Sequence, residues 1–330
     1  MNNLLFSFNI VMPMAILMLM GYIFKQIGMF TEVFITQGKK LCFYVLLSCS
    51  LFKNLYDSSL DSFPIGFISF VVIAILIEFV ISLIAANLIA DRKNQKGVII
   101  QGATRSNFAY LGIPLATMMF SDPEMIGQLR SEISLASIFV IPVFNIISVC
   151  ALAYYSDKNE NEKILKRTFK GLISNPCIDS ILLGLLVLMI RSLVPSVTFL
   201  IKDRLSFIYT VLSYLSSMST PFAFLLVGAS LDFSHSITNL KKLVYVVGLR
   251  IVIFPLLILS AAYFMNITSQ VEYAILVSVF ASPTAVASAI MASELGGDSD
   301  LANEIVIYST TFSIISLLLV IFVLRTVGCL

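Results

Sequence analysis

The chain has 330 residues, of which 58% are hydrophobic and 12% are charged, and its mean hydropathy is +0.98. Soluble domains carry roughly 25% charged residues, so this composition excludes an ordinary soluble protein and indicates an all-α integral membrane protein in a lipid bilayer. The net charge of +2 gives no argument for a nucleic-acid partner.

Ten apolar segments approach the roughly 20 residues that a helix needs to cross a bilayer. The segment nearest the N-terminus lacks the cationic start and the cleavage site of a signal peptide, so we interpret it as a span. The ten predicted transmembrane helices cover residues 4–24, 40–56, 64–90, 98–120, 133–155, 172–191, 206–230, 243–265, 271–292 and 302–325.

The fourth and ninth of these segments are interrupted at matching places. Pro114 and Pro283 lie about half the chain apart, and the same shift places the first, fourth and fifth spans on the sixth, ninth and tenth. Because five is an odd number, two consecutive copies of a five-span repeat must enter the membrane in opposite directions. The sequence predicts two inverted five-helix repeats, 1–155 and 172–330, joined by a cytoplasmic linker, 156–171.

The interrupted segments are the predicted binding site, because broken helices at equivalent positions of two halves are typical of transporter sites. If the first break lies near Gly112 to Pro114, the next half-helix offers free N–H groups and a positive dipole end that suit a carboxylate. The alternative is a pair of kinked structural helices whose polar groups bond to neighbours. The candidate substrate-binding residues are Arg105, Ser106, Asn107, Tyr110, Pro114, Ser282, Pro283, Thr284 and Ser288.

Glu78 and Arg250 are the candidates for ion coupling. Glu78 lies deep in the third span, where an ionisable side chain is costly and usually has a partner or a function. One such function is proton coupling, and the alternative is an inert carboxyl group paired with Arg105 or Arg250. Arg250 could balance the charge of the substrate or of Glu78, or extend to the cytoplasmic interface.

The sequence holds no motif of an enzyme or of a nucleotide-driven pump, such as His-Glu-x-x-His, Gly-x-Ser-x-Gly or a P-loop. The five cysteines have no metal or redox spacing, and His235 is the single histidine. We therefore expect neither catalytic residues nor a metal or other cofactor, with proton or sodium coupling left open.

The distribution of lysine and arginine predicts the orientation, since cytoplasmic loops carry an excess of both. Most of them fall on one side of the membrane if the N-terminus lies outside. We predict a multi-pass protein of the plasma membrane with both termini extracellular.

Several short sequences, in this order and spacing, are similar to those of one transporter family. They are Gly21-Tyr22, Phe43 to Leu47, Asn107 to Leu115, Ser174-Asn175-Pro176, Gly228 to Leu231, Arg250 to Pro255, Ala281-Ser282-Pro283 and Gly296-Gly297-Asp298. With them the chain resembles the auxin efflux carrier family, in the bile acid/sodium symporter-like superfamily. It departs at Ser48, where the family usually has a proline, and in its short linker.

The resemblance implies a fold in which spans one, two, six and seven form a scaffold, often a homodimer interface, and spans three to five and eight to ten form a moving transport unit. It implies substrate binding at the crossing of helices four and nine, with Asn107, Pro114 and Pro283 as crossover residues. It also implies small organic anions, mono- or dicarboxylates, as substrates.

The function predicted from these observations is secondary transport of a small organic anion by an elevator-type movement. Two alternatives stay open: a proton- or sodium-coupled symporter of another small solute, and a membrane sensor that binds a ligand without transporting it.

Overall fold

The computed structural model describes residues 2–57, 65–156, 176–193, 205–233 and 240–330, and helices make up most of them. The predicted linker (except Ser156), His235 and the pair Ser174-Asn175 lie outside these residues. The long helices are α1 (Asn2–Gln26), α4 (Ile65–Ile89), α7 (Pro123–Tyr155), α9 (Pro176–Leu193), α10 (Ser206–Ala229) and α15 (Ser299–Val327).

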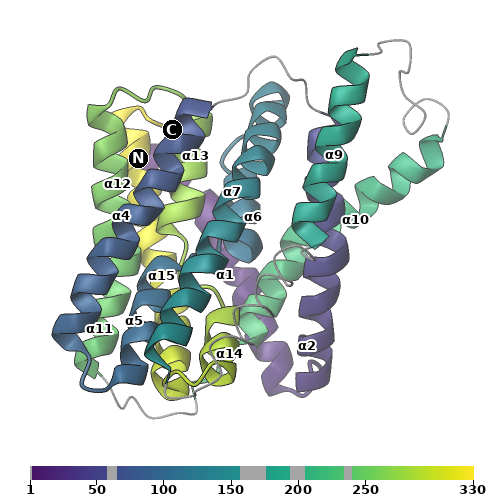
Figure 1. The fold of residues 1–330 in the computed structure, drawn as a ribbon. Helices are drawn as coiled ribbons and strands as arrows, with labels where there is room; N and C mark the ends of the chain where they lie inside the picture. Colours follow the sequence, from purple (N-terminus) through teal and green to yellow (C-terminus); the bar gives the residue numbers. More distant parts are fainter. Residues whose placement is uncertain (1, 58–64, 157–175, 194–204, 234–239) are drawn as a thin grey trace.

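The other helices of the described residues are shorter (Figure 1). They are α2 (Glu32–Leu41), α3 (Ser48–Tyr56), α5 (Lys93–Thr104), α6 (Ile113–Thr117), α11 (Leu240–Gly248), α12 (Phe254–Phe264), α13 (Gln270–Leu276) and α14 (Ala287–Glu294). The described residues also include four π-helical segments: Cys42–Leu47, Phe108–Gly112, Leu249–Ile253 and Val277–Ala281.

Within the described residues, six helices are long and apolar enough to cross a membrane: α1, α4, α7, α10, α15 and the continuous helix Leu240–Phe264. Two shorter apolar helices, Phe108–Thr117 and Gln270–Ala281, belong to the interrupted segments. An all-helical membrane protein is confirmed. The ten-span inverted repeat stays a prediction, although every predicted segment overlaps described helical residues.

One predicted boundary was wrong by a wide margin, because the fifth helix begins ten residues before the apolar segment. Asp122 caps α7 by accepting a hydrogen bond from the Met125 N–H, and Pro123 occupies the first turn, where its missing N–H costs nothing. The polar first turns of α7 therefore extend the helix beyond its hydrophobic part.

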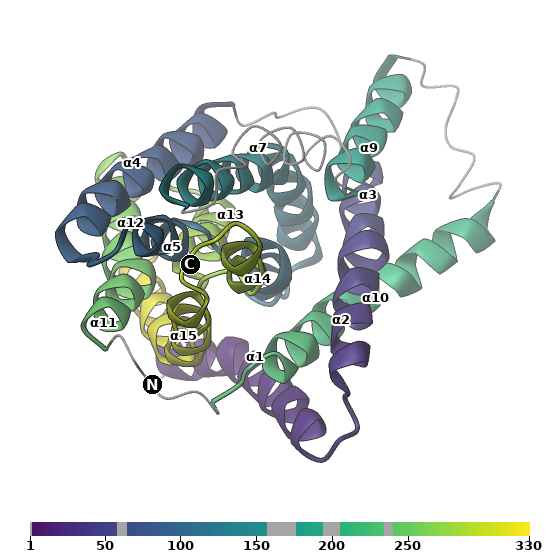
Figure 2. The ribbon, with the colours of Figure 1, turned by 60° about the horizontal axis from the view of Figure 1, so that its bottom comes forward.

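The helices form two groups that Figure 2 separates clearly. In one group, α1 packs along α10, and α3 packs against both α9 and α10. In the other, α4, α5, α7 and α11 to α15 form a compact bundle, which α1 contacts through α15. The division into a scaffold and a transport unit that the family resemblance implies stays a prediction.

Two glycines allow α1 and α10 to cross at backbone contact. A Cβ on Gly21 would overlap the carbonyl oxygen of Leu225, and a Cβ on Gly228 would overlap that of Met18. Small residues at such crossings let helix backbones approach closely in a membrane. The first group of helices is therefore joined by a contact that tolerates no side chain at either position.

After two of the π-helical segments, Phe108–Gly112 and Leu249–Ile253, the second residue is a proline. The N–H of Ile113, next to Pro114, bonds to the carbonyl of Phe108, five residues back, and that of Phe254, next to Pro255, bonds to Leu249. A proline cannot donate to the carbonyl four residues back, so we attribute the widened turn to it. At Cys42–Leu47 the next residue is Ser48, whose hydroxyl donates to the Phe43 carbonyl at 3.1 Å.

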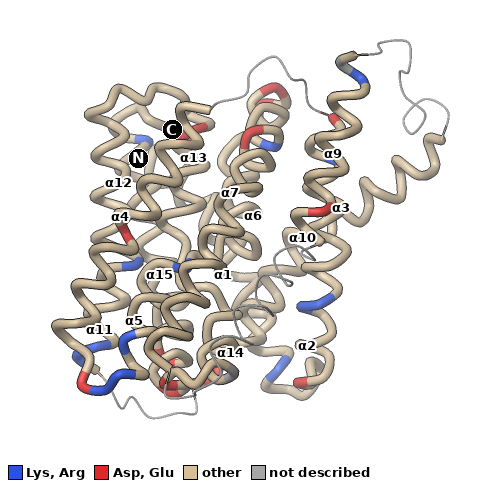
Figure 3. Tube along the Cα trace, viewed as in Figure 1, with Lys and Arg blue, Asp and Glu red and all other residues tan. Residues whose placement is uncertain are grey.

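Charged residues are distributed unevenly between the two ends of the molecule. Lys and Arg gather at the end opposite to both termini, around the α4–α5 turn, the start of α11 and α2 (Figure 3). There Lys242 forms an ion pair with Asp91, and its hydrogen bond holds the pKa of that carboxyl below its usual range. The cytoplasmic position of this end stays a prediction.

Candidate substrate-binding site

Two extended segments cross at the centre of the compact bundle and pair through their backbones. Residues 105–107 separate α5 from the next helical turn, and residues 282–286 precede α14. Ser106 and Thr284 form an antiparallel bridge, in which the Asn107 N–H donates to the Pro283 carbonyl at 2.7 Å and the Ala285 N–H donates to the Arg105 carbonyl at 3.0 Å. Each break thus satisfies polar backbone groups of the other, as a membrane interior requires.

The position of the first break corrects the sequence analysis, which placed it near Gly112 to Pro114. Pro114 instead lies within the continuous helix Phe108–Thr117, just after its π-helical turn, and the chain leaves the helical conformation at Arg105 to Asn107. Gly112 is a point of close approach between helices, since a Cβ there would overlap the carbonyl oxygen of Ser278. It allows the two interrupted helices to touch.

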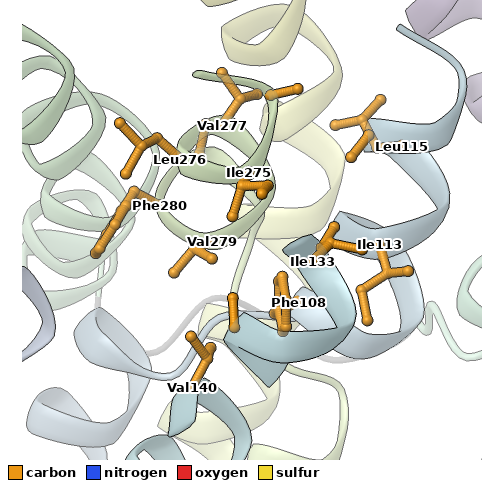
Figure 4. Close-up of a cluster of buried hydrophobic side chains, with 14 of the residues drawn as sticks. Phe108, Ile113, Leu115, Ile133, Val140, Ile275, Leu276, Val277, Val279 and Phe280 are labelled. Atoms are coloured by element: carbon orange, nitrogen blue, oxygen red, sulfur yellow. The ribbon is translucent and has the colours of Figure 1, made fainter. Parts of the chain in front are cut away.

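Apolar side chains join the two interrupted helices above the crossing. Phe108 and Ile113 of one, Val279 and Phe280 of the other, and Ile133 of α7 lie in one buried cluster (Figure 4). All five are at most 4% exposed. The two half-helices and α7 therefore form one packed unit.

Arg250 binds the carbonyl ends of both interrupted helices. Its Nη1 donates to the Thr104 carbonyl at 3.1 Å, at the end of α5, and its Nη2 donates to the Val279 carbonyl at 2.7 Å. Its Nε donates to the Ser282 carbonyl at 2.8 Å. A fully buried guanidinium thus neutralises two helix C-termini, which carry partial negative charge.

The opposite ends, the helix N-termini, face a cavity of about 290 Å³. Asn107 and Phe108, at the start of one half-helix, and Ala285 and Ala287, at the start of α14, all line it. The first turn of a helix has N–H groups without partners inside the helix, and it carries partial positive charge. The backbone therefore makes this cavity electropositive.

The polar wall of the cavity consists of Arg105, Ser106, Asn107 and Asn145. Arg105 donates through Nη2 to Asn145 Oδ1 at 2.8 Å, and through Nη1 it contacts the sulfur of Met291. Asn107 and Ser106 are 2% and 6% exposed, yet Asn107 Nδ2 and Ser106 Oγ have no hydrogen-bond partner among the described residues. Buried polar groups are normally paired, so these two atoms indicate a polar ligand.

The apolar wall is largely aromatic and comes from both groups of helices. Phe43, at the π-helical segment after α2, stacks on Tyr110 with ring centroids 5.9 Å apart. Phe108 and the α7 residues Ile141 and Phe144 complete this wall. The Tyr110 hydroxyl donates to the Lys39 carbonyl at 3.0 Å, so the cavity lies at the boundary between the two groups.

The structure brings only some of the predicted site residues to the cavity. Arg105, Ser106, Asn107 and Tyr110 line it. Four others are not among its lining residues and contribute to the architecture of the crossing instead. The carbonyls of Ser282 and Pro283 accept hydrogen bonds, and the Thr284 hydroxyl donates to the Gly102 carbonyl. The fourth, Pro114, lies in α6. Ser288 lies in the first turn of α14, and its Oγ has no partner among the described residues.

Sequence reasoning missed Asn145, Phe43 and Phe144. A signal existed for Asn145, because a single amide in the apolar stretch Ile141 to Cys150 is unusual for a membrane helix. The two phenylalanines carry no such signal, since the chain has 26 of them.

Glu78 and Arg250, the coupling candidates, form a pair away from the cavity lining. The distance from Arg250 Nη1 to Glu78 Oε2 is 3.5 Å, and both side chains are fully buried. Glu78 Oε1 has no hydrogen-bond partner among the described residues. Glu78 therefore adjoins the side chain that holds the crossing and keeps one oxygen available.

The sequence of residues 6–321 matches the family model described as "Membrane transport protein". The chain belongs to this family. The match confirms the resemblance to the auxin efflux carrier family and makes the chain a membrane transport protein. It is also similar to an uncharacterized transporter of Methanothermobacter thermautotrophicus, with 23% identity over 315 residues that cover 94% of this chain and 96% of the relative.

Proposed function

We propose that this membrane transport protein is a secondary transporter of small organic anions, with the substrate bound in the cavity at the crossing. The observation that carries the proposal is the separation of helix ends: Arg250 covers the negative ends, whereas the positive ends face the cavity beside Arg105. An anion gains from both the dipoles and the guanidinium, and a cation gains from neither.

The lining residues suggest how a carboxylate would bind. Arg105 is the positively charged side chain of the cavity wall and would pair with one carboxylate group. Asn107 Nδ2, which has no partner among the described residues, would donate a hydrogen bond to a second oxygen of the substrate. Phe43, Phe108 and Phe144 would cover an apolar body. These features favour a monocarboxylate over a dicarboxylate.

The proposed movement is of the elevator type, with the compact bundle travelling against the group that contains α1, α3, α9 and α10. The cavity at the boundary of the two groups supports this mechanism. We further propose a homodimer in the plasma membrane with both termini outside, an orientation that the gathering of Lys and Arg at the opposite end supports.

A thermal-shift panel tests the binding proposal. Purified protein would be heated with acetate, phenylacetate, malonate or malate, at two pH values and with or without sodium. A ligand of the folded state raises its stability in proportion to occupancy, so at least one carboxylate must raise the Tm. If no acid does so while amino acids or neutral solutes do, the anion proposal is wrong.

A coupled symporter is the second candidate, because Glu78 Oε1 has no hydrogen-bond partner among the described residues, while Oε2 of the same carboxyl lies 3.5 Å from Arg250 Nη1. A proton taken up there would change the charge next to the crossing. A sensor without transport is distinguished by counterflow: preloaded unlabelled carboxylate accelerates the uptake of labelled carboxylate only through a carrier.

A further inference from the structure

The backbone carbonyl of Lys39, on α2, accepts a hydrogen bond from the hydroxyl of Tyr110, a residue that lines the cavity. The buried stripe of α2, which includes Ile35 and Gly38, is turned toward α10, where the Leu226 side chain lies against Gly38. Lys39 and Phe43 lie beside this stripe, one helical turn apart. Phe43 stacks on Tyr110, and the Tyr110 hydroxyl bonds to the Lys39 backbone.

The ammonium group of Lys39 has no carboxylate of the described residues within ion-pair distance. Glu32, on the same helix, is paired with Lys25 at 2.9 Å. Burial lowers the pKa of Lys39 to about 8, with Glu32 opposing and Lys25 adding to the shift. The neighbouring Lys40 is exposed, whereas Lys39 is half-buried, so these adjacent lysines lie in different surroundings.

We propose that Lys39 is a second contact for the anion, on the approach from the cation-rich end to the cavity. The Phe43–Tyr110 pair separates this contact from Arg105. A carboxylate held near Lys39 would pass this aromatic pair to reach the guanidinium. The inference rests on the proposed function, since it assumes that the substrate is an anion.

Electrostatics gives the contact a measurable signature. A partly buried, unpaired cation raises the local concentration of anions, and salt screens this attraction over a Debye length of about 8 Å at physiological ionic strength. Loss of the charge should therefore affect capture of the substrate more than the maximal rate.

The test compares Lys39→Gln with Lys40→Gln in proteoliposomes, with labelled phenylacetate and labelled malate supplied from the cation-rich side. For Lys39→Gln we expect the half-saturation concentration to rise about three- to tenfold at low ionic strength, with an unchanged maximal rate. The difference should shrink at high salt, Lys39→Arg should restore transport, and Lys40→Gln should match the unchanged protein.

Two results would overturn the inference: equal behaviour of Lys39→Gln and Lys40→Gln, or a lower maximal rate at unchanged half-saturation, which indicates a structural role. Failure of the proposed function looks different, because the unchanged protein would then transport neither acid.

Discussion

The backbone N–H of Asn107 donates to the carbonyl of Pro283 at 2.7 Å, so one residue serves both the architecture and the cavity. Its main chain joins the two interrupted helices, while its side-chain amide lines the cavity with Nδ2 unpaired. Substitution of the side chain alone can therefore separate ligand binding from assembly.

Asn107→Ala should abolish detectable carboxylate binding and leave the fold intact. The backbone pairing with Pro283 persists in the variant, whereas a hydrogen bond to an ionised ligand contributes about 1.5–3 kcal/mol, or roughly a 10- to 150-fold change in affinity. Thermal shifts with the carboxylate panel measure the loss. Asn87→Ala removes an exposed amide of α4 and serves as the control. Unchanged affinity in Asn107→Ala would show that the site lies elsewhere.

Asn145→Asp should weaken the binding of a carboxylate in the cavity. Asn145 Oδ1 already accepts from Arg105 at 2.8 Å, and a carboxylate there would pair with the guanidinium and compete with the substrate. We expect at least about a tenfold loss of affinity, since charge-assisted bonds are about twice as strong as neutral ones. Isothermal titration measures it, with Asn145→Leu removing the acceptor without adding charge. The interpretation is wrong if Asn145→Asp binds the acid as tightly as the original protein.

Gly112→Ala should destabilise the protein, because the added Cβ would overlap the Ser278 carbonyl. Overpacking of this kind costs about 1–3 kcal/mol. Gly127→Ala is the matched control, since a Cβ at that helical position meets no atom within 4 Å and alanine favours a helix by about 0.5–1 kcal/mol. Thermal unfolding should therefore give opposite shifts for the two variants, and equal shifts would contradict the close approach.

Arg250→Lys should be strongly destabilising although it keeps the charge. An ammonium group cannot reproduce the planar fork that reaches Thr104, Val279 and Ser282 at once. Each buried carbonyl left unpaired costs about 1–3 kcal/mol. Arg92→Lys, at an exposed position before α5, is the control. A melting temperature equal to that of the control would remove Arg250 from this structural role.

Glu78→Gln tests the coupling candidate. Glutamine keeps an oxygen that can accept from Arg250, so the protein should fold and still respond to its carboxylate in the thermal-shift panel. If Glu78 carries the coupled proton, uptake by the variant no longer follows an imposed pH gradient. Transport with an unaltered pH dependence would exclude that role.

The sequence predicted the helical segments and the two interruptions well, because apolar length and broken periodicity are local properties. It misplaced the first break since Pro114 looked like an obstacle, whereas the helix Phe108–Thr117 accommodates this proline with a π-helical turn. It predicted Arg105 and Asn107 among the site residues because they are polar residues in an interrupted apolar segment, and the family resemblance also pointed to Asn107. The structural role of Arg250 depends partly on the Thr104 carbonyl, more than 140 residues earlier in the chain. No local sequence pattern can reveal such a contact.

Ser48 illustrates a departure from the family that the structure accommodates. Its hydroxyl donates to the carbonyl of Phe43, the residue that stacks on Tyr110 in the cavity. A proline at this position could not make that bond, because its side chain has no donor. On this side of the cavity, the π-helical segment Cys42–Leu47 is therefore stabilised by the hydrogen bond from the Ser48 hydroxyl.

The clamp at Arg250 also constrains the order of biosynthesis. The carbonyl of Thr104 receives its partner from a residue that follows 146 positions later, and the N–H of Asn107 awaits Pro283. While the ribosome is still completing the second half, the interrupted helix of the first half lacks these partners in the bilayer. The crossing can therefore complete its hydrogen bonds only after residue 283 of the second half has been synthesised.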